Sequence, residues 1–450
     1  MTAYIPHTPL DTERMLSAIG LSSMQELFST IPSDLILDAD LPLERGIGEE
    51  RALQYIRALA NKNILGTSFL GMGSYDRIIP SAVKELGANP AFVTAYTPYQ
   101  SEISQGLLQA IFEFQSMMCL LTGLDAANAS LYDHSSAAAE AASVMLQAKR
   151  KSSVILVSQT LHPFTLEVLK TWAKGTANTI TIIPECRRQT DVSALVKHID
   201  ETVAGVIVQT PNRYGFIEDY GDLATQLHQH NALLCISSDP LSLVLQQSPK
   251  QRGADIAIGD TQPLGLPSGF GGPSCGYMAV TEQLIRRLPG RIVGQTVDAN
   301  NNKGYVLTLQ AREQHIKRQR SASNICSNQA LAALMTTIHI SLVGQRGLEE
   351  AAQLSWDKAH YLADKLAKID SLLVDQSNHY WCEFPLTFKT IEQMERVLAK
   401  LKEEHIWGGV RLGPLTKRPN DASTIIVAVT EKRTKEELDR YVQIVSKECL

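Results

Sequence analysis

The sequence lacks several features that would assign it to a particular protein class. None of its seven cysteines forms a Cys-x-x-Cys pair, which argues against a zinc or other metal site. The N-terminus has neither the basic segment nor the apolar core of a secretory signal, so we expect a cytoplasmic protein with reduced thiols. The longest apolar region, residues 107–124, contains Glu113 and Gln115, which predicts a buried helix and no membrane partner.

Strong charge of either sign is also missing. The formal net charge is −5, and this mild acidic balance argues against nucleic acid as a general partner. Apolar residues make up 44% and charged residues 20%, as in ordinary globular proteins. With 450 residues, the chain is long enough for one large domain and a smaller one, each with its own core.

The pattern of apolar residues predicts an α/β fold. Short β-rich runs alternate with helical stretches, which indicates a largely parallel sheet covered on both faces. The runs are residues 153–157, 179–183, 205–209, 233–237, 255–258 and 276–280. Helical patterns at 328–342 and 349–368 lead to a final mixed segment. We expect an N-terminal helical arm over 1–66, a large α/β domain over 67–330 and a small α+β domain over 331–450.

Three places in the predicted sheet domain have both a ligand-binding and a structural interpretation. The helix that begins near Ser135 and Ser136 could bind a phosphate at its N-terminus, or it is simply N-capped by Asp133, Ser135 or Ser136. The negative charges of Asp133 and Glu140 disfavour an anion there. His162 follows a strand and either stacks on a planar cofactor or is a loop histidine satisfied by backbone. Asp239 either pairs with a pyridinium nitrogen or forms a turn before Pro240.

Two further segments are candidates for binding. The loop containing Tyr96, Tyr99, Gln100 and Glu102 concentrates phenols, an amide and a carboxylate, which are suited to orienting an amino acid. Its alternative interpretation is a packed surface loop with locally satisfied hydroxyls. The basic segment 312–320 is either a solvated helix face or a binding site for a phosphate or an acidic partner.

Several stretches form an ordered set of motifs. Two of them are Phe-Leu-Gly-Met-Gly-Ser-Tyr-Asp at 69–76 and Thr-Leu-Gln-Ala-Arg-Glu-Gln-His-Ile at 308–316. The others are residues 94–100, 102–106, 109–115, 269–273, 288–294 and 323–326. In these stretches the chain resembles the P-protein family of glycine decarboxylases, and specifically the first subunit, which corresponds to the N-terminal half of fused forms.

This resemblance implies the architecture of a fold-type-I, PLP-dependent transferase-like enzyme. It also implies a second, homologous subunit that carries pyridoxal 5′-phosphate (PLP), in a two-plus-two heterotetramer. The implied reaction is decarboxylation of glycine with transfer of the aminomethyl group to the lipoyl arm of H-protein, whose disulfide is reduced. T-protein and L-protein would be indirect partners.

The resemblance makes one absence informative. PLP enzymes hold their cofactor as a Schiff base to a lysine, and in this fold the lysine follows the strand after the pyridinium aspartate. Here that region, residues 257–265, contains no lysine, and Lys250 and Lys303 lie too far away in the sequence. We therefore expect PLP on the partner subunit and none on this chain.

The chain would then complete the partner's active site. The candidates for reaching the substrate or the lipoyl-arm channel are Tyr96, Tyr99, Gln100, Glu102, Arg312 and Arg320. The residues of a vestigial cofactor site are Ser135, Ser136, His162 and Asp239. Where the family has Asp-Gly followed by Thr or Ser, this chain has Asp133-His134-Ser135-Ser136. This difference fits a phosphate site that no longer binds PLP.

Two alternatives remain open from the sequence. One is a self-sufficient PLP enzyme whose lysine comes from an unexpected segment. The other is a structural or regulatory scaffold that contributes no residue to an active site.

Overall fold

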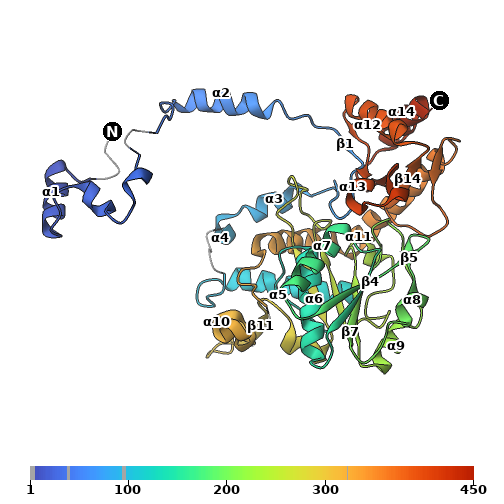
Figure 1. Cartoon of the computed structure of the whole chain (residues 1–450), viewed down its shortest axis with the longest axis horizontal. Helices are drawn as coiled ribbons and strands as arrows, with labels where there is room; N and C mark the ends of the chain where they lie inside the picture. The colour runs from blue at the N-terminus through green and yellow to red at the C-terminus, as the bar shows by residue number, and fades with distance from the viewer. Residues whose placement is uncertain (1–5, 38–40, 94–97, 322, 450) are drawn as a thin grey trace. The chain divides into compact units, whose positions relative to one another are not determined.

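The computed structural model describes residues 6–37, 41–93, 98–321 and 323–449 (Figure 1). The chain divides into two compact units, Met1–Ile64 and Leu65–Leu450. Among the described residues, no helix combines the length and the apolar character needed to cross a membrane.

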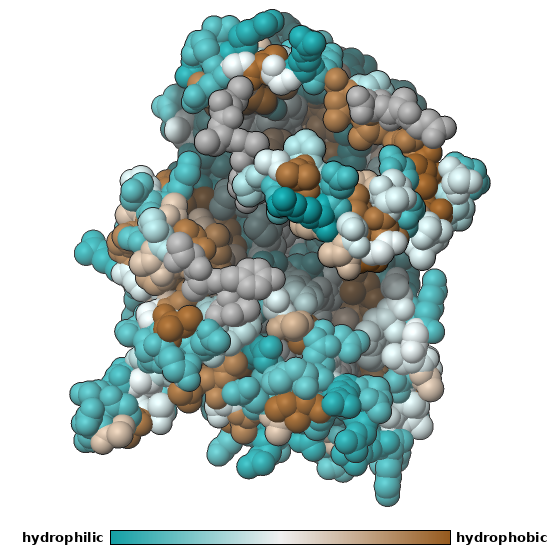
Figure 2. Space-filling view, turned by 90° about the vertical axis from the view of Figure 1, so that its left-hand side faces the viewer, coloured by the Kyte–Doolittle hydropathy of each residue, from teal (hydrophilic) through white to brown (hydrophobic). Residues whose placement is uncertain are grey.

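The first unit consists of short helices with almost no core. Its elements are α1 (Pro9–Ala18), η1 (Met24–Phe28), η2 (Ser33–Leu35) and α2 (Glu49–Ala60). Helix α1 begins with a capping box in which Thr8 and Asp11 satisfy each other's backbone N–H groups. Leu16 is the one buried apolar residue that the structure describes in this unit. Except for the partly buried Leu21, the other large apolar side chains that the structure describes in this unit are exposed. Hydrophobic patches interrupt the hydrophilic surface of the molecule in the view of Figure 2.

The second unit is built around a seven-stranded sheet with the order β2-β10-β9-β8-β7-β3-β4. The strands are β2 (Ala126–Ala127), β3 (Val154–Ser158), β4 (Thr179–Ile183), β7 (Val203–Gln209), β8 (Leu233–Ser237), β9 (Ile256–Asp260) and β10 (Gly276–Val280). The five strands from β9 to β4 are parallel, whereas β10 runs antiparallel to both of its neighbours. The prediction of a largely parallel sheet is therefore confirmed.

Helices cover both faces of this sheet. They are α5 (Gln105–Thr122), α6 (His134–Ala148), α7 (Pro163–Lys174), α8 (Val192–Val196) and α9 (Leu223–Gln229). Strand side chains alternate between the faces: Ile155 and Val157 pack with α6 and α7, whereas Leu156 packs with α8 and α9. Because both faces are buried, each strand is a nearly continuous apolar run.

The C-terminal part contains a second sheet. Its antiparallel order is β13-β14-β17-β16, formed by β13 (Leu372–Val374), β14 (Glu383–Phe388), β17 (Thr424–Ala428) and β16 (Val410–Arg411). Helices α12 (Ile391–Glu403) and α14 (Lys435–Cys449) pack on it around a core that includes Phe384, Ile426 and Tyr441. Strand β1 (Thr67–Ser68) pairs with β15 (Ile406–Trp407), so the start of this unit is anchored beside its C-terminal part.

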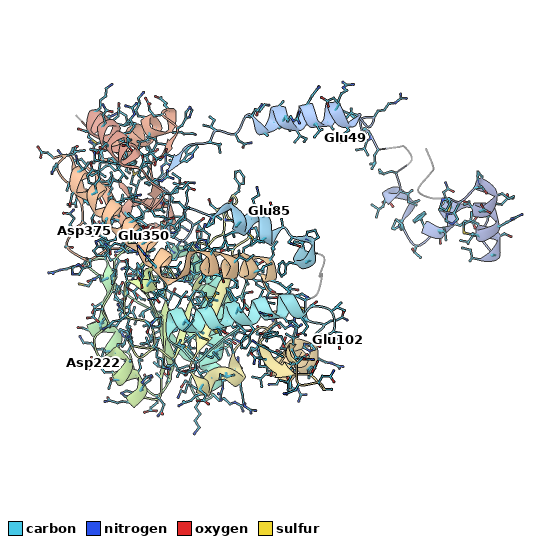
Figure 3. All side chains as sticks on the ribbon, turned by 180° about the vertical axis from the view of Figure 1, so that it is seen from behind. Glu49, Glu85, Glu102, Asp222, Glu350 and Asp375 are labelled. Atoms are coloured by element: carbon cyan, nitrogen blue, oxygen red, sulfur yellow. The ribbon has the colours of Figure 1, made fainter. Side chains whose placement is uncertain are left out.

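One long helix connects the two sheets. Helix α11 (Ala330–Leu366) packs against α5 and α3 (Ser81–Gly87) and, further along, against α14. Figure 3 shows α11, which carries Glu350, lying above α5. The helix is interrupted at Gly344, whose φ of 62° and ψ of −177° are not helical.

The remaining elements are short connections. They are α4 (Pro90–Val93), the hairpins β5–β6 (Glu185–Cys186, Gln189–Thr190) and β11–β12 (Val293–Val297, Lys303–Leu307), α10 (Gln314–Lys317), α13 (Gly413–Thr416), η3 (Ser242–Val244), η4 (Glu282–Arg287), η5 (Gln310–Arg312), η6 (Arg318–Arg320) and η7 (Pro419–Asp421).

A buried ion pair joins the large sheet region to the C-terminal part. Arg77 Nη1 lies 2.6 Å from Glu431 Oε2, and both side chains are almost fully buried. Ser355, on α11, accepts a hydrogen bond from Arg77, and the Arg77 guanidinium lies over the ring of Trp381. Removing one partner of such a buried pair would leave a charge uncompensated, so the pair holds the two parts together. Trp381, under the guanidinium, lines the pocket described next.

Candidate functional site

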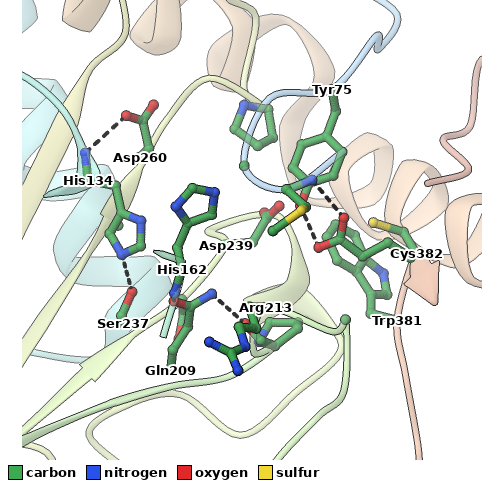
Figure 4. A pocket seen from close by; sticks show the side chains of 18 residues that line it. Tyr75, His134, His162, Gln209, Arg213, Ser237, Asp239, Asp260, Trp381 and Cys382 are labelled. Carbon is green, nitrogen blue, oxygen red and sulfur yellow. Dashed lines mark hydrogen bonds between the residues drawn. The ribbon is translucent and has the colours of Figure 1, made fainter. Parts of the chain in front are cut away.

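A pocket opens at the carboxyl edge of the parallel strands. Gln209, Ser237 and Asp260, at the ends of β7, β8 and β9, line it together with His134 at the start of α6. Glu383 lines it from the C-terminal part, together with Trp381 and Cys382, which are labelled in Figure 4. Ligands of open α/β sheets bind at this edge, because the loops that follow parallel strands converge there. This cleft is named the sheet-edge pocket below.

The N-terminus of α6 forms one wall of the sheet-edge pocket. Asp133 is its N-cap, and its carboxylate accepts a 2.7 Å hydrogen bond from the backbone N–H of Ser136. The carboxylate of Asp260 accepts from the backbone N–H of His134. The hydroxyl of Ser135 bonds to that of Thr165 at 3.0 Å. Carboxylates thus take backbone donors that a phosphate would need, so the predicted N-cap is confirmed.

Asp239 presents a partly satisfied carboxylate in the pocket. Its Oδ1 accepts a hydrogen bond from the backbone N–H of Leu241, as expected of a turn residue. Its Oδ2 is buried and has no hydrogen-bond partner among the described residues. Burial raises the pKa of Asp239 to about 6. The residue therefore forms the turn and also lines the pocket.

His162 lies between His134 and Asp239 in Figure 4. Its Nδ1 accepts a hydrogen bond from the backbone N–H of Phe164, so this side chain caps α7. Burial lowers the pKa of His162 to about 4, which keeps the imidazole neutral at physiological pH. Burial also lowers the pKa of the partly exposed His134, whose Nε2 lies 2.5 Å from the hydroxyl of Ser237.

The sequence interpretation missed the residues that close the sheet-edge pocket. Glu383 accepts hydrogen bonds from the backbone N–H of Met72 and the hydroxyl of Tyr75, and burial raises its pKa to about 7. Arg213 lines the pocket and pairs with Glu185 at 2.8 Å. The stretch 69–76 signalled this region only through the family resemblance, because its partner Glu383 lies more than 300 residues away.

The residues present do not fit a covalently held PLP. Among the described residues that line the sheet-edge pocket none is a lysine, so no side-chain amine is placed there to form a Schiff base. The open volume is about 60 Å³, whereas pockets for cofactor-sized ligands span about 300–1,000 Å³. The pocket has room for a few water molecules at most.

The predicted substrate loop is anchored at one tyrosine. The Tyr99 hydroxyl donates a 2.7 Å hydrogen bond to Asn328 Oδ1, and Arg291 lies over its ring at 4.7 Å. Burial raises the pKa of Tyr99. Gln100 and Glu102 are exposed, and Figure 3 shows Glu102 beyond the N-terminal end of α5. Tyr96 lies outside the described residues.

The basic segment lies close to this loop. Arg291 forms a 2.5 Å ion pair with Glu313, which precedes α10, and Arg312 is partly buried beside it. Arg320 is exposed in η6. The structure therefore gathers Tyr99 and Arg312 around Arg291. Of the other predicted set, it places His162 and Asp239 in the sheet-edge pocket. Ser135 and Ser136, in the first turn of α6, do not line that pocket, and Ser136 lines a separate cleft.

Comparison with known proteins gives a consistent family. The glycine cleavage system P-protein family matches the chain over residues 2–445. The chain is 45% identical over 439 residues to a probable glycine dehydrogenase (decarboxylating) subunit 1 of Desulforamulus reducens, covering 97% of each chain. It is also 45% identical over 442 residues to a protein of the same name from Listeria monocytogenes, covering 98% of this chain and 97% of that one.

Solved structures agree in architecture. The chain is similar, with a TM-score of 0.88 and 36% identity, to a glycine decarboxylase (P-protein) of the glycine cleavage system in inhibitor-bound form. That likeness covers 99% of this chain and 100% of the other. A glutamate decarboxylase of Lactobacillus brevis shares the fold, with a TM-score of 0.69 at 12% identity over 95% and 96% of the two chains. The expected fold-type-I architecture is confirmed.

Proposed function

Because the chain belongs to the glycine cleavage system P-protein family, we propose that it is the glycine decarboxylase subunit that holds no cofactor of its own. The observation that carries this proposal is the sheet-edge pocket, which has no lysine in its lining and little open volume. At the same edge, Asp133 and Asp260 take backbone donors of α6 that a cofactor phosphate would need. The pocket keeps the position of a PLP site without the groups that hold PLP.

The proposed reaction belongs to the complex. Glycine loses its carboxyl group as CO₂, and the remaining aminomethyl group becomes bonded to one sulfur of the lipoyl arm of H-protein. The lipoyl disulfide is reduced in the same overall reaction, and its second sulfur becomes a thiol. PLP, held by a second and homologous subunit, supplies the electron sink for decarboxylation.

This chain would contribute the loop around Tyr99 to the partner's active site. The contacts of Tyr99 with Asn328 and Arg291 fix the loop on the large domain, because they use both its hydroxyl and its ring face. Gln100 and Glu102 remain exposed and free to orient glycine or to line the path of the lipoyl arm. Tyr96 is the fourth candidate in this loop.

Arg312 and Arg320 would add positive charge near the same loop. Arg312 lies beside the Arg291–Glu313 pair, and Arg320 is exposed to a docking protein. We propose that they attract H-protein, which we expect to be acidic. T-protein and L-protein act on H-protein afterwards and would not contact this chain directly.

The N-terminal unit supports a permanent partner. Its helices expose Leu53, Ile56 and Leu59 along one face of α2, with exposed fractions between 40% and 59%. A segment with so little core of its own needs another surface to bury its apolar side chains. We propose that this surface belongs to the PLP-bearing subunit, in a two-plus-two heterotetramer.

Glycine–bicarbonate carboxyl exchange tests the proposal. In the presence of H-protein and PLP, the chain alone should give no exchange and no aldimine absorbance in the visible range. Exchange should appear when the PLP-bearing subunit is added. Exchange by the isolated chain would show that a lysine elsewhere holds PLP, and the proposal would be wrong.

The same assay distinguishes a catalytic contribution from a scaffold. With the partner present, Gln100→Ala and Glu102→Ala should each lower kcat by about tenfold or more, as the loss of one positioned polar contact does. The matched control is Gln345→Ala, since Gln345 is also an exposed glutamine, but on α11. Unchanged kcat in both loop variants, with normal assembly, would favour the scaffold alternative.

A further inference from the structure

A second, smaller cleft lies between residues 286–290 and 312–323. It shares no lining residue with the sheet-edge pocket, and we name it the cationic cleft. Four cationic side chains line it: Arg286, Arg287, Arg312 and Lys317. Its open volume is about 30 Å³, so with about 10–15 Å³ needed for one water it can hold only one small group.

The guanidinium of Arg312 is only partly satisfied in this cleft. Its Nη1 donates to the backbone carbonyl of Leu288. Its Nε and Nη2 are buried, and neither has an acceptor among the described residues. Buried donors of a charged group are rarely left without a partner, because desolvation without a hydrogen bond is costly. An acceptor placed in the cleft would remove that cost.

The nearby polar groups do not supply this acceptor. Glu313 also lines the cleft and its carboxylate lies 2.5 Å from Arg291, but neither of its oxygens accepts a hydrogen bond from Arg312. The Ser321 hydroxyl donates to the backbone carbonyls of Arg312 and Ser323, and the Ser323 hydroxyl donates to Glu140. Across the described ranges, none of the four cations of the cleft forms an ion pair with a carboxylate. The cleft therefore has a surplus of positive charge.

We propose that the cationic cleft binds a phosphate group, either as inorganic phosphate or as the terminal group of a phosphate ester. Arginine matches phosphate oxygens through its fork of N–H donors, and several cations around one small space suit a dianion better than a single carboxylate. The small open volume fits one tetrahedral anion and excludes a bulky ligand within the cleft. This inference goes beyond the proposed function and does not depend on it.

Calorimetric titration of the full chain with inorganic phosphate tests the site. Ionic strength is held constant with sodium chloride, since general screening also acts on surface charge. We expect saturable one-to-one binding. Arg312→Lys keeps the charge but removes the fork, and should weaken binding about tenfold, the loss expected for a charge-assisted hydrogen bond.

A second variant keeps the test valid if Arg312→Lys fails to fold. Arg286 and Lys317 are exposed, so the double variant Arg286→Gln/Lys317→Gln should fold normally and weaken phosphate binding by about fivefold or more. The matched control is Arg346→Gln, because Arg346 is exposed on α11 and does not line the cleft. It should bind phosphate as the unaltered chain does.

Titration with glycerol 3-phosphate separates the two sources. Tighter binding of the ester than of inorganic phosphate would identify a terminal phosphate group as the ligand, and equal or weaker binding would identify the free anion. Absence of saturable binding of both probes would overturn the proposal. Equal phosphate affinity of the unaltered chain and the Arg286→Gln/Lys317→Gln variant would also overturn it.

Discussion

Individual buried carboxyl groups hold protons near neutral pH in this molecule. Glu140, on α6, has its pKa raised to about 7 by burial, although a 3.0 Å hydrogen bond donated by Ser323 opposes that shift. Burial likewise raises the pKa of Glu383 to about 7 and that of Asp239 to about 6. Since the charged form is the one that burial disfavours, these groups make stability depend on pH.

Glu140→Gln should flatten that dependence. A carboxyl with a raised folded pKa stabilises the fold fully below its unfolded pKa of 4.5, and this contribution is lost as pH rises through about 7. The free energy of unfolding of the unaltered chain should therefore fall by up to about 3 kcal/mol more than that of the variant between pH 4.5 and 8. Glutamine keeps an acceptor for Ser323, so the variant should fold.

Urea unfolding at several pH values measures this difference. Glu350→Gln is the control, because Glu350 is exposed on α11 and its substitution removes one carboxyl without touching a buried site. Its curve should run parallel to that of the unaltered chain. A Glu140→Gln curve that also runs parallel would contradict the assignment of the pH dependence to Glu140.

Single residues were predictable where their role is local. An N-cap was expected at Asp133, Ser135 or Ser136 before an alanine-rich helix, and the structure places it at Asp133. His162 and Asp239 each satisfy a backbone N–H two residues further along, which is again a local contact. Arg213 and Glu383 were not predicted, because only the tertiary fold brings them to the pocket. No pattern within a short window of sequence marks such residues.

Helices and strands were predictable where burial requires a clear pattern of apolar residues in the sequence. Strands buried on both faces appear as apolar runs, and the runs at 179–183, 233–237 and 276–280 agree with β4, β8 and β10. The antiparallel direction of β10 could not be predicted from the sequence, because a strand covered on both faces is an apolar run whichever way it points. The separation of 328–342 from 349–368 agrees with the interruption of α11 at Gly344, where the backbone is not helical.

The bend in α11 requires glycine. Gly344 combines a φ of 62° with a ψ of −177°, a region that is essentially restricted to glycine. A Cβ at this position would meet nothing within 4 Å, so Gly344→Ala would suffer backbone strain and no steric clash. We expect the variant to lose about 1–3 kcal/mol of unfolding free energy in chemical denaturation.

Gly106→Ala is the matched control for the bend. Gly106 lies in α5, has equally open space for a Cβ and has no positive φ. Alanine should there be neutral or stabilising by up to about 1 kcal/mol, because it loses less backbone entropy in a helix. Equal effects of the two substitutions would show that Gly344 can adopt helical geometry without cost.

At the scale of the whole molecule, the two units differ in how they are stabilised. The second unit buries five apolar clusters, and all of their buried members lie at or beyond Phe69. Over the residues that the structure describes, the first unit buries Leu16, partly buries Leu21 and leaves its other large apolar side chains exposed. The boundary expected between the large and the small domain, at residues 330 and 331, falls at the start of α11. Because this helix packs on both sheets, it belongs to neither domain alone, and the boundary stays a prediction.

Removal of residues 1–64 should therefore separate folding from assembly. The shortened chain keeps every cluster that forms the large core, so its circular dichroism and cooperative unfolding should match those of the full chain. It should fail to form the heterotetramer with the PLP-bearing subunit, as measured by size-exclusion chromatography with light scattering.

Ile56→Glu in the full chain should also weaken assembly, because it places a charge on the exposed apolar face of α2. Glu50→Gln, at the start of that helix, is the control and should assemble normally. A shortened chain that assembles and exchanges glycine carboxyl at the full rate would mean that the arm contacts something other than this partner, and the partner interface would then have to lie within residues 65–450.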